Sequence, residues 1–309
     1  MKRLQDKEVI TMNIKSLAQK ICADSSELAG LTTTVEKELL HYEVLASMAK
    51  HGFLKQLTFQ GGTCLRMMYG SSRLSEDLDF VGGADFDFDQ LAHLRDCLHE
   101  DLSQRHNLKV NVTEPNYGKL SNKEAIQVGR WKISIETEPD KKSLPWQKVK
   151  LEVATVIAHT QVLRPLVKTY PSVPDAYVSI LLNCETLEEI AADKFVALAL
   201  RRSIKARDVW DIAWLNQRNV QVDAELVRTK FQDYHQPAGF EALSGRLQEL
   251  PSYMASGDFQ QEMRRFLHSS TVANSIEQDG FIDYLTDTVI RMGDQLLREQ
   301  GGESPEFKM

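Results

Sequence analysis

The sequence predicts an α+β protein in which strands and helices are mixed up to about residue 185 and helices alone follow. Three features of the 309 residues support this prediction. Short β-forming runs bounded by turn residues occur in the first part, helical spacing of apolar residues dominates the second part, and a helix-capping pattern stands at the junction. We therefore divide the chain into residues 1–185 and residues 186–309.

Composition excludes several classes of protein. The apolar fraction is 42%, the charged fraction is 26% and the net charge is −7, so any nucleic-acid contact must come from a local basic patch. No run approaches the ~20 apolar residues of a transmembrane helix, and the first twenty residues lack the apolar core of a signal peptide. Four scattered cysteines indicate buried thiols in a reducing compartment, with neither a disulfide framework nor a zinc site. We expect a cytoplasmic protein without a membrane partner.

The first part contains the predicted strands. Residues 32–51 place Val35, Leu39, Tyr42 and Ala46 on one helical stripe. A strand at 57–60 ends at a glycine pair and is followed by a short helix at 63–69. The remaining expected elements are a strand at 78–81, a helix at 90–105 with leucines at 91, 94, 98 and 102, strands at 108–112, 129–136 and 148–155, a proline-rich boundary at 165–174 and a last strand at 177–182.

The junction carries a helix start signal. Thr186 is followed three residues later by Glu189 and then by an apolar run, which fits a capping box. Every element from residue 187 onward is expected to be helical.

Two aspartates, Asp77 and Asp79, stand where the strand at 78–81 should bury apolar side chains. Residues i and i+2 of a strand point to one face, about 7 Å apart, so the two carboxylates repel each other unless a cation lies between them. Mg²⁺ or Mn²⁺ fits, because both ions prefer oxygen ligands and bridge to phosphate. Taken alone, the pair also fits an acidic turn.

A phosphate-binding segment precedes these acids. Gly61 and Gly62 let the backbone approach a ligand closely, and Thr63 opens a short helix whose N–H groups and dipole favour an anion. Arg73 and Ser75 could supplement it. Together with the two aspartates, the segment predicts a site for a nucleoside triphosphate and its metal.

Glu152 is the candidate third acid. In the strand at 148–155 the apolar side chains alternate onto one face, and Lys148, Lys150 and Glu152 take the other. Glu152 is therefore either the third ligand of a two-metal site or a solvated partner of Lys150.

Lys194 lies in the middle of the apolar stripe of the helix that begins at 187, so it needs a carboxylate or phosphate partner. Asp208 and Asp211 share a partly apolar helix face, and Lys194 is their natural cation. Three interpretations stay open: Lys194 binds a nucleotide in the active site, it snorkels out of the packed face, or the ion pairs only join two helices.

Three segments in order, GGTCLRMMYGSSRLSEDLDF, TLEEIAADKFVAL and KARDVWDIAWL, resemble the AbiEii/AbiGii-type abortive-infection toxins, which are nucleotidyltransferase-like toxins of type IV toxin–antitoxin systems. The resemblance covers roughly residues 55–220. It implies a polymerase-β-like nucleotidyltransferase core with a C-terminal helical bundle. The residues that match the family motifs are Gly61, Gly62, Thr63, Asp77, Asp79, Lys194, Arg207, Asp208 and Asp211, and Glu152 is carried over less directly.

The resemblance also implies an activity and partners. These are Mg²⁺-dependent transfer of a nucleotide from an NTP to RNA, most directly the tRNA 3′ end, inhibition of translation and growth, a role in phage defence, and a separately encoded antitoxin of winged-helix type. Two alternatives stay open. One is transfer of the γ-phosphate to a protein hydroxyl, and the other is a nucleotide-binding module without turnover.

Two basic stretches could face a phosphate backbone, although both also fit solvated surfaces. One is RRSIKAR at 201–207. The other, at 130–150, sets Arg130, Lys132, Lys141, Lys142, Lys148 and Lys150 against three acids.

Overall fold

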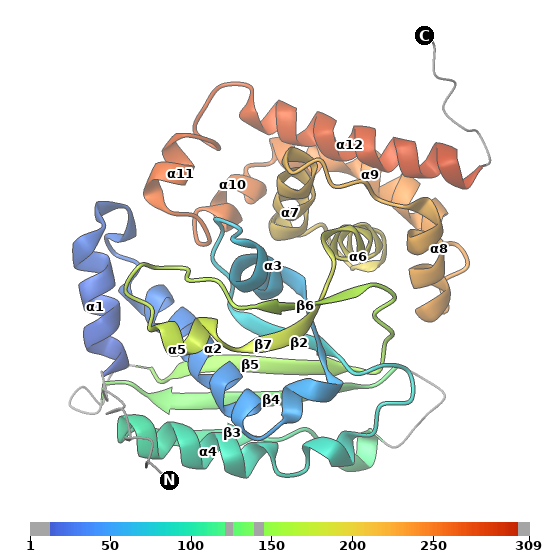
Figure 1. Ribbon diagram of the computed structural model, residues 1–309. Coiled ribbons are helices and arrows are strands. Elements are labelled where there is room, and N and C mark those ends of the chain that lie inside the picture. The colour runs from blue at the N-terminus through green and yellow to red at the C-terminus, as the bar shows by residue number, and fades with distance from the viewer. Residues whose placement is uncertain (1–12, 121–125, 139–144, 302–309) are drawn as a thin grey trace.

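The computed structural model describes residues 13–120, 126–138 and 145–301. Within them, seven strands form one sheet in the order β3-β4-β5-β2-β1-β7-β6, with helices packed around it (Figure 1). The strands are β1 (Thr58–Gln60), β2 (Asp77–Val81), β3 (Lys109–Thr113), β4 (Val128–Glu136), β5 (Gln147–Ala154), β6 (Gln161–Pro165) and β7 (Leu181–Glu185). The mixed α/β fold expected from the sequence is therefore confirmed.

Helices surround the sheet and make up the chain after β7. The α-helices are α1 (Ile14–Asp24), α2 (Thr32–Lys50), α3 (Gly61–Tyr69), α4 (Leu94–His106), α5 (Asp175–Val178), α6 (Leu187–Leu200), α7 (Ala206–Gln217), α8 (Ala224–Asp233), α9 (Gly239–Ala255), α10 (Asp258–Met263), α11 (Ser269–Ala273) and α12 (Phe281–Gln300). Short 3-10 helices are η1 (Ser26–Leu28), η2 (Phe53–Gln56), η3 (Phe88–Leu91) and η4 (Tyr117–Lys119).

The pleat of β4 and β5 separates a buried face of the sheet from an open one. Trp131, Ile133, Val149 and Leu151 are buried and share one hydrophobic cluster with residues of α2 and α4. The intervening side chains are polar, and those of both strands that carry a positive charge are exposed. The alternation predicted for residues 148–155 is confirmed, and it leaves one polar sheet face available to solvent.

The chain after β7 is helical through residue 301, and α6 to α12 enclose a second hydrophobic cluster. The two clusters are in contact through shared helices, because Ile190 of α6 and Leu215 of α7 belong to the first cluster while Phe195 and Ile212 belong to the second. The helical part thus packs directly on the sheet part. The division at residue 185/186 stays a prediction.

The junction forms as expected. α6 begins at Leu187, and the Glu189 N–H donates to the Thr186 hydroxyl at 3.3 Å. The Glu189 carboxylate does not return to Thr186 N–H. It accepts instead from the backbone N–H of His159 at 2.7 Å, so the cap is one-sided and the acid ties the preceding loop to the helix.

One expected strand was wrong and one strand was not predicted. Residues 177–182 are not one strand, because α5 occupies the start of this range and β7 begins only at Leu181. The strand β6 was missed: all five of its residues are exposed at the sheet edge, so burial imposes no alternation, and the edge tolerates its terminal Pro165. The helix predicted at 32–51 is confirmed as α2: Val35, Leu39 and Tyr42 of its predicted stripe are buried and Ala46 is partly buried, and the helix also buries the charged Glu38.

The described residues contain no helix whose length and apolar content would let it cross a membrane. The four cysteines are free thiols, and the burial expected of them holds for Cys64 and Cys184, whereas Cys22 and Cys97 are only partly buried.

Candidate active site

The acids predicted from sequence meet on the open side of the sheet. β2 lies between β1 and β5, and its parallel register with β5 places Asp79 beside Glu152 and Asp77 beside Lys150. In-register neighbours point to the same face, so Asp77, Asp79 and Glu152 form one group. Long-range strand pairing therefore brings together three carboxylates from two segments of the chain.

Asp79 is the least compensated of the three. Within the described part of the chain its carboxylate makes no hydrogen bond and no ion pair. Burial, followed by the charges of Asp77 and Glu152, raises its pKa to about 6, against the opposing influence of Lys194 and Arg201. A carboxylate in this state favours a proton or a cation.

The other two acids have counter-ions on neighbouring strands. Lys150 Nζ is 3.7 Å from Asp77 Oδ1, and Arg130 Nε donates to Glu152 Oε1 at 3.0 Å. The Lys150–Glu152 contact considered from sequence is replaced by these two cross-strand pairs. Both cations are more than 60% exposed (63% for Lys150 and 65% for Arg130), so solvent weakens both pairs.

A three-acid metal site is not assembled. No group of three His, Cys, Asp or Glu side chains among the residues described is arranged to hold a metal ion, and Glu152 is engaged by Arg130. Asp77 and Asp79 nevertheless fit Mg²⁺, since both offer carboxylate oxygens and Asp79 has no competing partner. Proteins usually bind Mg²⁺ through one or two carboxylates plus substrate phosphates, so two acids are a sufficient protein contribution.

The glycine pair brings the start of α3 against these acids. Gly61 has φ +77°, and a Cβ there would lie 3.1 Å from Asp79 Oδ2. A Cβ on Gly62 would lie 2.2 Å from Arg73 Nη2. No side chain caps the N-terminus of α3, so its first N–H groups remain free to bind an anion beside the acids.

The hydroxyl groups of Thr63 and Ser75, which were predicted to contact the nucleotide, face the protein interior. The Thr63 hydroxyl donates to the carbonyl of Asp77, and its oxygen lies 2.9 Å from Ser75 Oγ. Thr63 and Ser75 are both buried. In this structure they hold the start of β2 against α3, and neither has a hydroxyl turned toward a ligand.

A second charged cluster joins the sheet part to the helices. The Arg73 guanidinium donates two hydrogen bonds to the Asp211 carboxylate, of 2.5 and 2.6 Å. Lys194 Nζ lies 2.8 Å from Asp211 and 2.9 Å from Asp208. Arg201 also belongs to this cluster, because its Nη1 lies 3.0 Å from Asp208 Oδ2. The expected contact between Lys194 and both aspartates is confirmed, and Arg73 is committed to Asp211.

Electrostatics in this cluster are the reverse of those at Asp79. Burial alone would raise the pKa of Asp211, but Arg73 and Lys194 lower it below its ordinary value. Burial likewise would lower the pKa of Lys194, but Asp208 and Asp211 raise it. These groups are charged at neutral pH and satisfied by one another.

Sequence reasoning missed two cations that face the acids. Arg201 was placed only in a basic run; it directly follows the last residue of α6, in an extended conformation, and reaches Asp208 from there. Arg130 was counted in a basic stretch, although its position in an alternating strand already put it on the polar face. Strand alternation would have placed Arg130, whereas the position of Arg201 and the partners of both residues depended on the tertiary fold.

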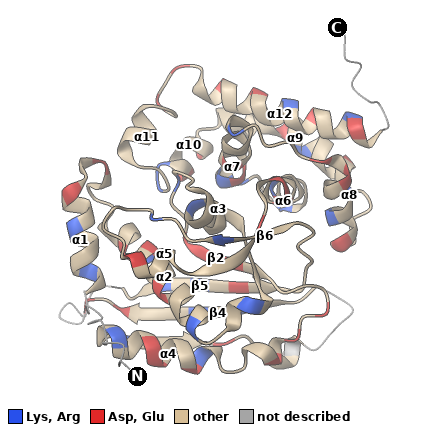
Figure 2. Ribbon diagram, in the orientation of Figure 1, with Lys and Arg blue, Asp and Glu red and all other residues tan. Residues whose placement is uncertain are grey.

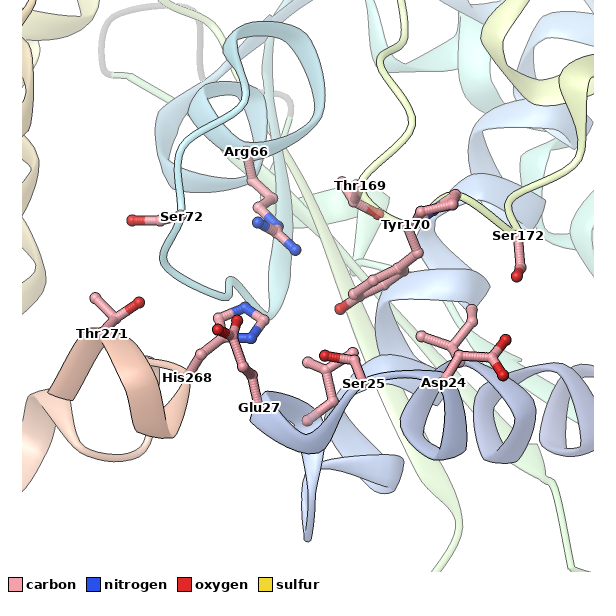
Figure 3. A pocket seen from close by; sticks show the side chains of 13 residues that line it. Asp24, Ser25, Glu27, Arg66, Ser72, Thr169, Tyr170, Ser172, His268 and Thr271 are labelled. Carbon is pink, nitrogen blue, oxygen red and sulfur yellow. The ribbon is translucent and has the colours of Figure 1, made fainter. Parts of the chain in front are cut away.

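A separate pocket of about 430 Å³ lies between α1, the C-terminal half of α3 and α11. Figure 3 shows Arg66, Tyr170 and His268 directed into it from three segments of the chain. None of the predicted site residues lines it.

The chain was compared with protein families and with known proteins, and the family match agrees with the motifs. A family model described as "Nucleotidyl transferase AbiEii toxin, Type IV TA system" matches residues 43–279. A solved structure from H. pylori, described as a "putative nucleotidyltransferase", is 15% identical with a TM-score of 0.49, and the match covers 87% of this chain and 96% of that one. JHP933 from Helicobacter pylori is 16% identical with a TM-score of 0.47, covering 87% and 95%. No curated protein matches the chain.

Proposed function

Because the chain belongs to the AbiEii family of nucleotidyltransferase toxins of type IV toxin–antitoxin systems, we propose that it transfers a nucleotide from an NTP to the 3′-hydroxyl of an RNA. The tRNA 3′ end is the acceptor we favour, and its modification would inhibit translation and growth. The proposal takes the sheet part as a polymerase-β-like core and α6 to α12 as a C-terminal bundle.

One observation carries the proposal. The uncompensated Asp79 carboxylate lies between Asp77 and Glu152 and directly against the uncapped N-terminus of α3. Carboxylates that need a cation thus adjoin N–H groups that need an anion. A metal-bound triphosphate supplies both charges at once.

The reaction requires few groups from the protein. The RNA 3′-oxygen attacks the α-phosphorus, the bond from that phosphorus to the β-phosphate oxygen breaks, pyrophosphate leaves and the hydroxyl proton is lost to water. Asp77 and Asp79 would hold Mg²⁺, which when bound neutralises charge on the phosphates. The N-terminus of α3 would orient the triphosphate, so catalysis rests on positioning and charge stabilisation.

The Lys194 cluster would act as a fixed source of positive charge. Three cations, Arg73, Lys194 and Arg201, share two aspartates, which leaves one unbalanced positive charge. Lys194 and Arg201 both favour ionisation of Asp79, so this charge acts on the same site. Asp208 and Asp211 would then serve the reaction by holding Lys194 in place.

The family implies an antitoxin partner and a nucleotide substrate. We further propose that the antitoxin is separately encoded and of winged-helix type, and that the toxin acts in the cytoplasm during phage defence, where its tRNA acceptor is found.

Incubation of the protein with total tRNA and each labelled NTP in turn, with Mg²⁺ present, tests the proposal. We expect labelled tRNA and released pyrophosphate, and neither product from an Asp79→Asn variant. Release of a nucleoside diphosphate with labelled protein would replace the proposal by phosphoryl transfer. Nucleotide binding without any product would indicate a binding module.

A further inference from the structure

The open face of the sheet carries basic side chains that lead up to the acids. In the antiparallel register of β4 and β5, Arg130 pairs with Glu152, Lys132 with Lys150, and Ser134 with Lys148. These residues lie on the same face as Asp77 and Asp79, which continue the rows on β2. Figure 2 shows acidic segments on the neighbouring strands β2 and β5.

The fold itself does not require this arrangement. Lys132 and Lys150 are direct cross-strand neighbours, and like charges in such positions destabilise a sheet. Lys132 and Lys148 are exposed and make no ion pair within the described residues. In a chain of net charge −7, four adjacent cations at the edge of the active site indicate a polyanionic ligand.

The extent of the row distinguishes a long ligand from a short one. Lys150 and Lys148 lie two and four residues before Glu152 on β5, so they extend about 7 and 13 Å away from the acids at 3.3 Å per residue. A triphosphate held by Asp77, Asp79 and α3 would not span this row, whereas successive phosphates of a nucleic-acid strand would.

The other basic stretch is less available. Arg201 is bound to Asp208, and Arg207 contacts Glu262 at 3.7 Å and stacks over the Phe266 ring. Lys141 and Lys142 of the 130–150 stretch lie outside the described residues, so the surface rests on Arg130, Lys132, Lys148 and Lys150 alone. We call these four residues the β4–β5 basic face.

We propose that the β4–β5 basic face binds the phosphate backbone of the single-stranded 3′ end of the acceptor and leads its terminal hydroxyl to Asp77 and Asp79. The inference rests on the proposed function for the identity of the acceptor as RNA. Lys132 and Lys148 bind phosphates only, while Arg130 and Lys150 exchange their acidic partners for phosphates as metal and nucleotide occupy the acids.

The test uses the double variant Lys132→Gln/Lys148→Gln, because neither lysine has a partner to lose. Its matched control is Lys20→Gln/Lys55→Gln, which removes two exposed lysines of α1 and η2, outside this face. Binding of a fluorescent single-stranded oligoribonucleotide is measured over a salt series without NTP. We expect the slope of log affinity against log salt to become shallower by about 1.4, at 0.7 per lost contact, only in the first variant.

Two further measurements make the result decisive. NTP affinity should be unchanged in both variants, and the thermal midpoint of Lys132→Gln/Lys148→Gln should stay equal or rise. A wild-type salt slope in that variant, or an equal change in the control, would overturn the proposal; retained RNA binding with lost binding of the antitoxin would assign the face to a protein partner. If the salt slope of the Lys132→Gln/Lys148→Gln variant becomes shallower but the wild-type protein transfers no labelled nucleotide to RNA, the proposed function fails, whereas the proposed RNA-binding surface stands.

Discussion

Two pairs of aspartates in this protein differ in how well neighbouring cations compensate their charge. Asp77 and Asp79 crowd a third acid, and Asp79 has no partner and a pKa raised to about 6. Asp208 and Asp211 are more deeply buried, yet they contact three cations, and the pKa of Asp211 is lowered. The comparison teaches that burial alone does not mark a ligand site. We expect the ligand site where charge compensation is missing, whereas the aspartates that cations compensate join helices to the sheet part.

The largest effect is expected from the uncompensated pair. Asp77→Asn or Asp79→Asn should reduce nucleotide transfer by about a hundred- to a thousand-fold, the scale on which loss of one electrostatic group acts, while the circular dichroism spectrum stays native. Each variant removes an oxygen ligand and a repulsive charge together. If either variant inhibits the growth of the cells that express it as strongly as the wild type does, these acids are not part of the active site.

The second largest effect is expected at Asp208 and Asp211, the pair whose charge is compensated by cations. Asp211→Asn leaves Arg73 and Lys194 partly unpaired in a buried position, so the free energy of unfolding should fall by about 3–5 kcal/mol. Urea denaturation measures the fall. The control is Glu225→Gln, which breaks an exposed pair with Arg228 and should cost less than about 1 kcal/mol. Equal losses in both variants would contradict the distinction between the two regions.

Lys194 tests whether the compensated cluster also serves the ligand. Lys194→Met removes a positive charge that acts on the Asp79 site and should weaken nucleotide binding about ten-fold, the scale of a charge interaction at partial burial, as followed by titration of the folded protein. If the variant is destabilised but its folded fraction binds nucleotide and turns over normally, Lys194 only joins the helices.

A smaller effect with the opposite sign is expected for stability at Asp79. Its native pKa of about 6 exceeds the ordinary 3.8, so the folded protein binds the proton more tightly, and stability falls as pH rises through this window. Asp79→Asn should therefore raise the free energy of unfolding by between about 1 and 3 kcal/mol at pH 7.5. The gain should vanish near pH 4, and a gain that persists there would refute electrostatic strain as its cause.

The smallest effect concerns the hydroxyl that links α3 to β2. Ser75→Ala loses the contact with Thr63 and should cost about 1 kcal/mol of stability with activity largely kept. Ser75→Asp adds a buried negative charge two residues before Asp77, so it should cost more stability than Ser75→Ala and lower the activity of the folded fraction by repelling the triphosphate, as phosphorylation would. If Ser75→Asp is as active and as toxic as wild type, negative charge at this position does not control the site.

Local sequence patterns determined much of this protein. Strand alternation placed Asp77, Asp79 and Glu152 on polar faces, glycine chemistry placed the start of α3, and the cap at Thr186 placed the start of α6, because each depends on residues fewer than five positions apart. The position of Lys194 within an apolar stripe also required an acidic partner nearby.

Only the tertiary structure decided which charges are satisfied. Arg73, expected at the nucleotide, binds Asp211, which is 138 positions away, and Glu152 pairs with Arg130 through the β4–β5 register. The edge strand β6 and the break between α5 and β7 likewise depended on sheet order. The physical reason is that an ion pair forms according to distance in space, and that distance is set by strand register and helix packing between segments that no local pattern relates.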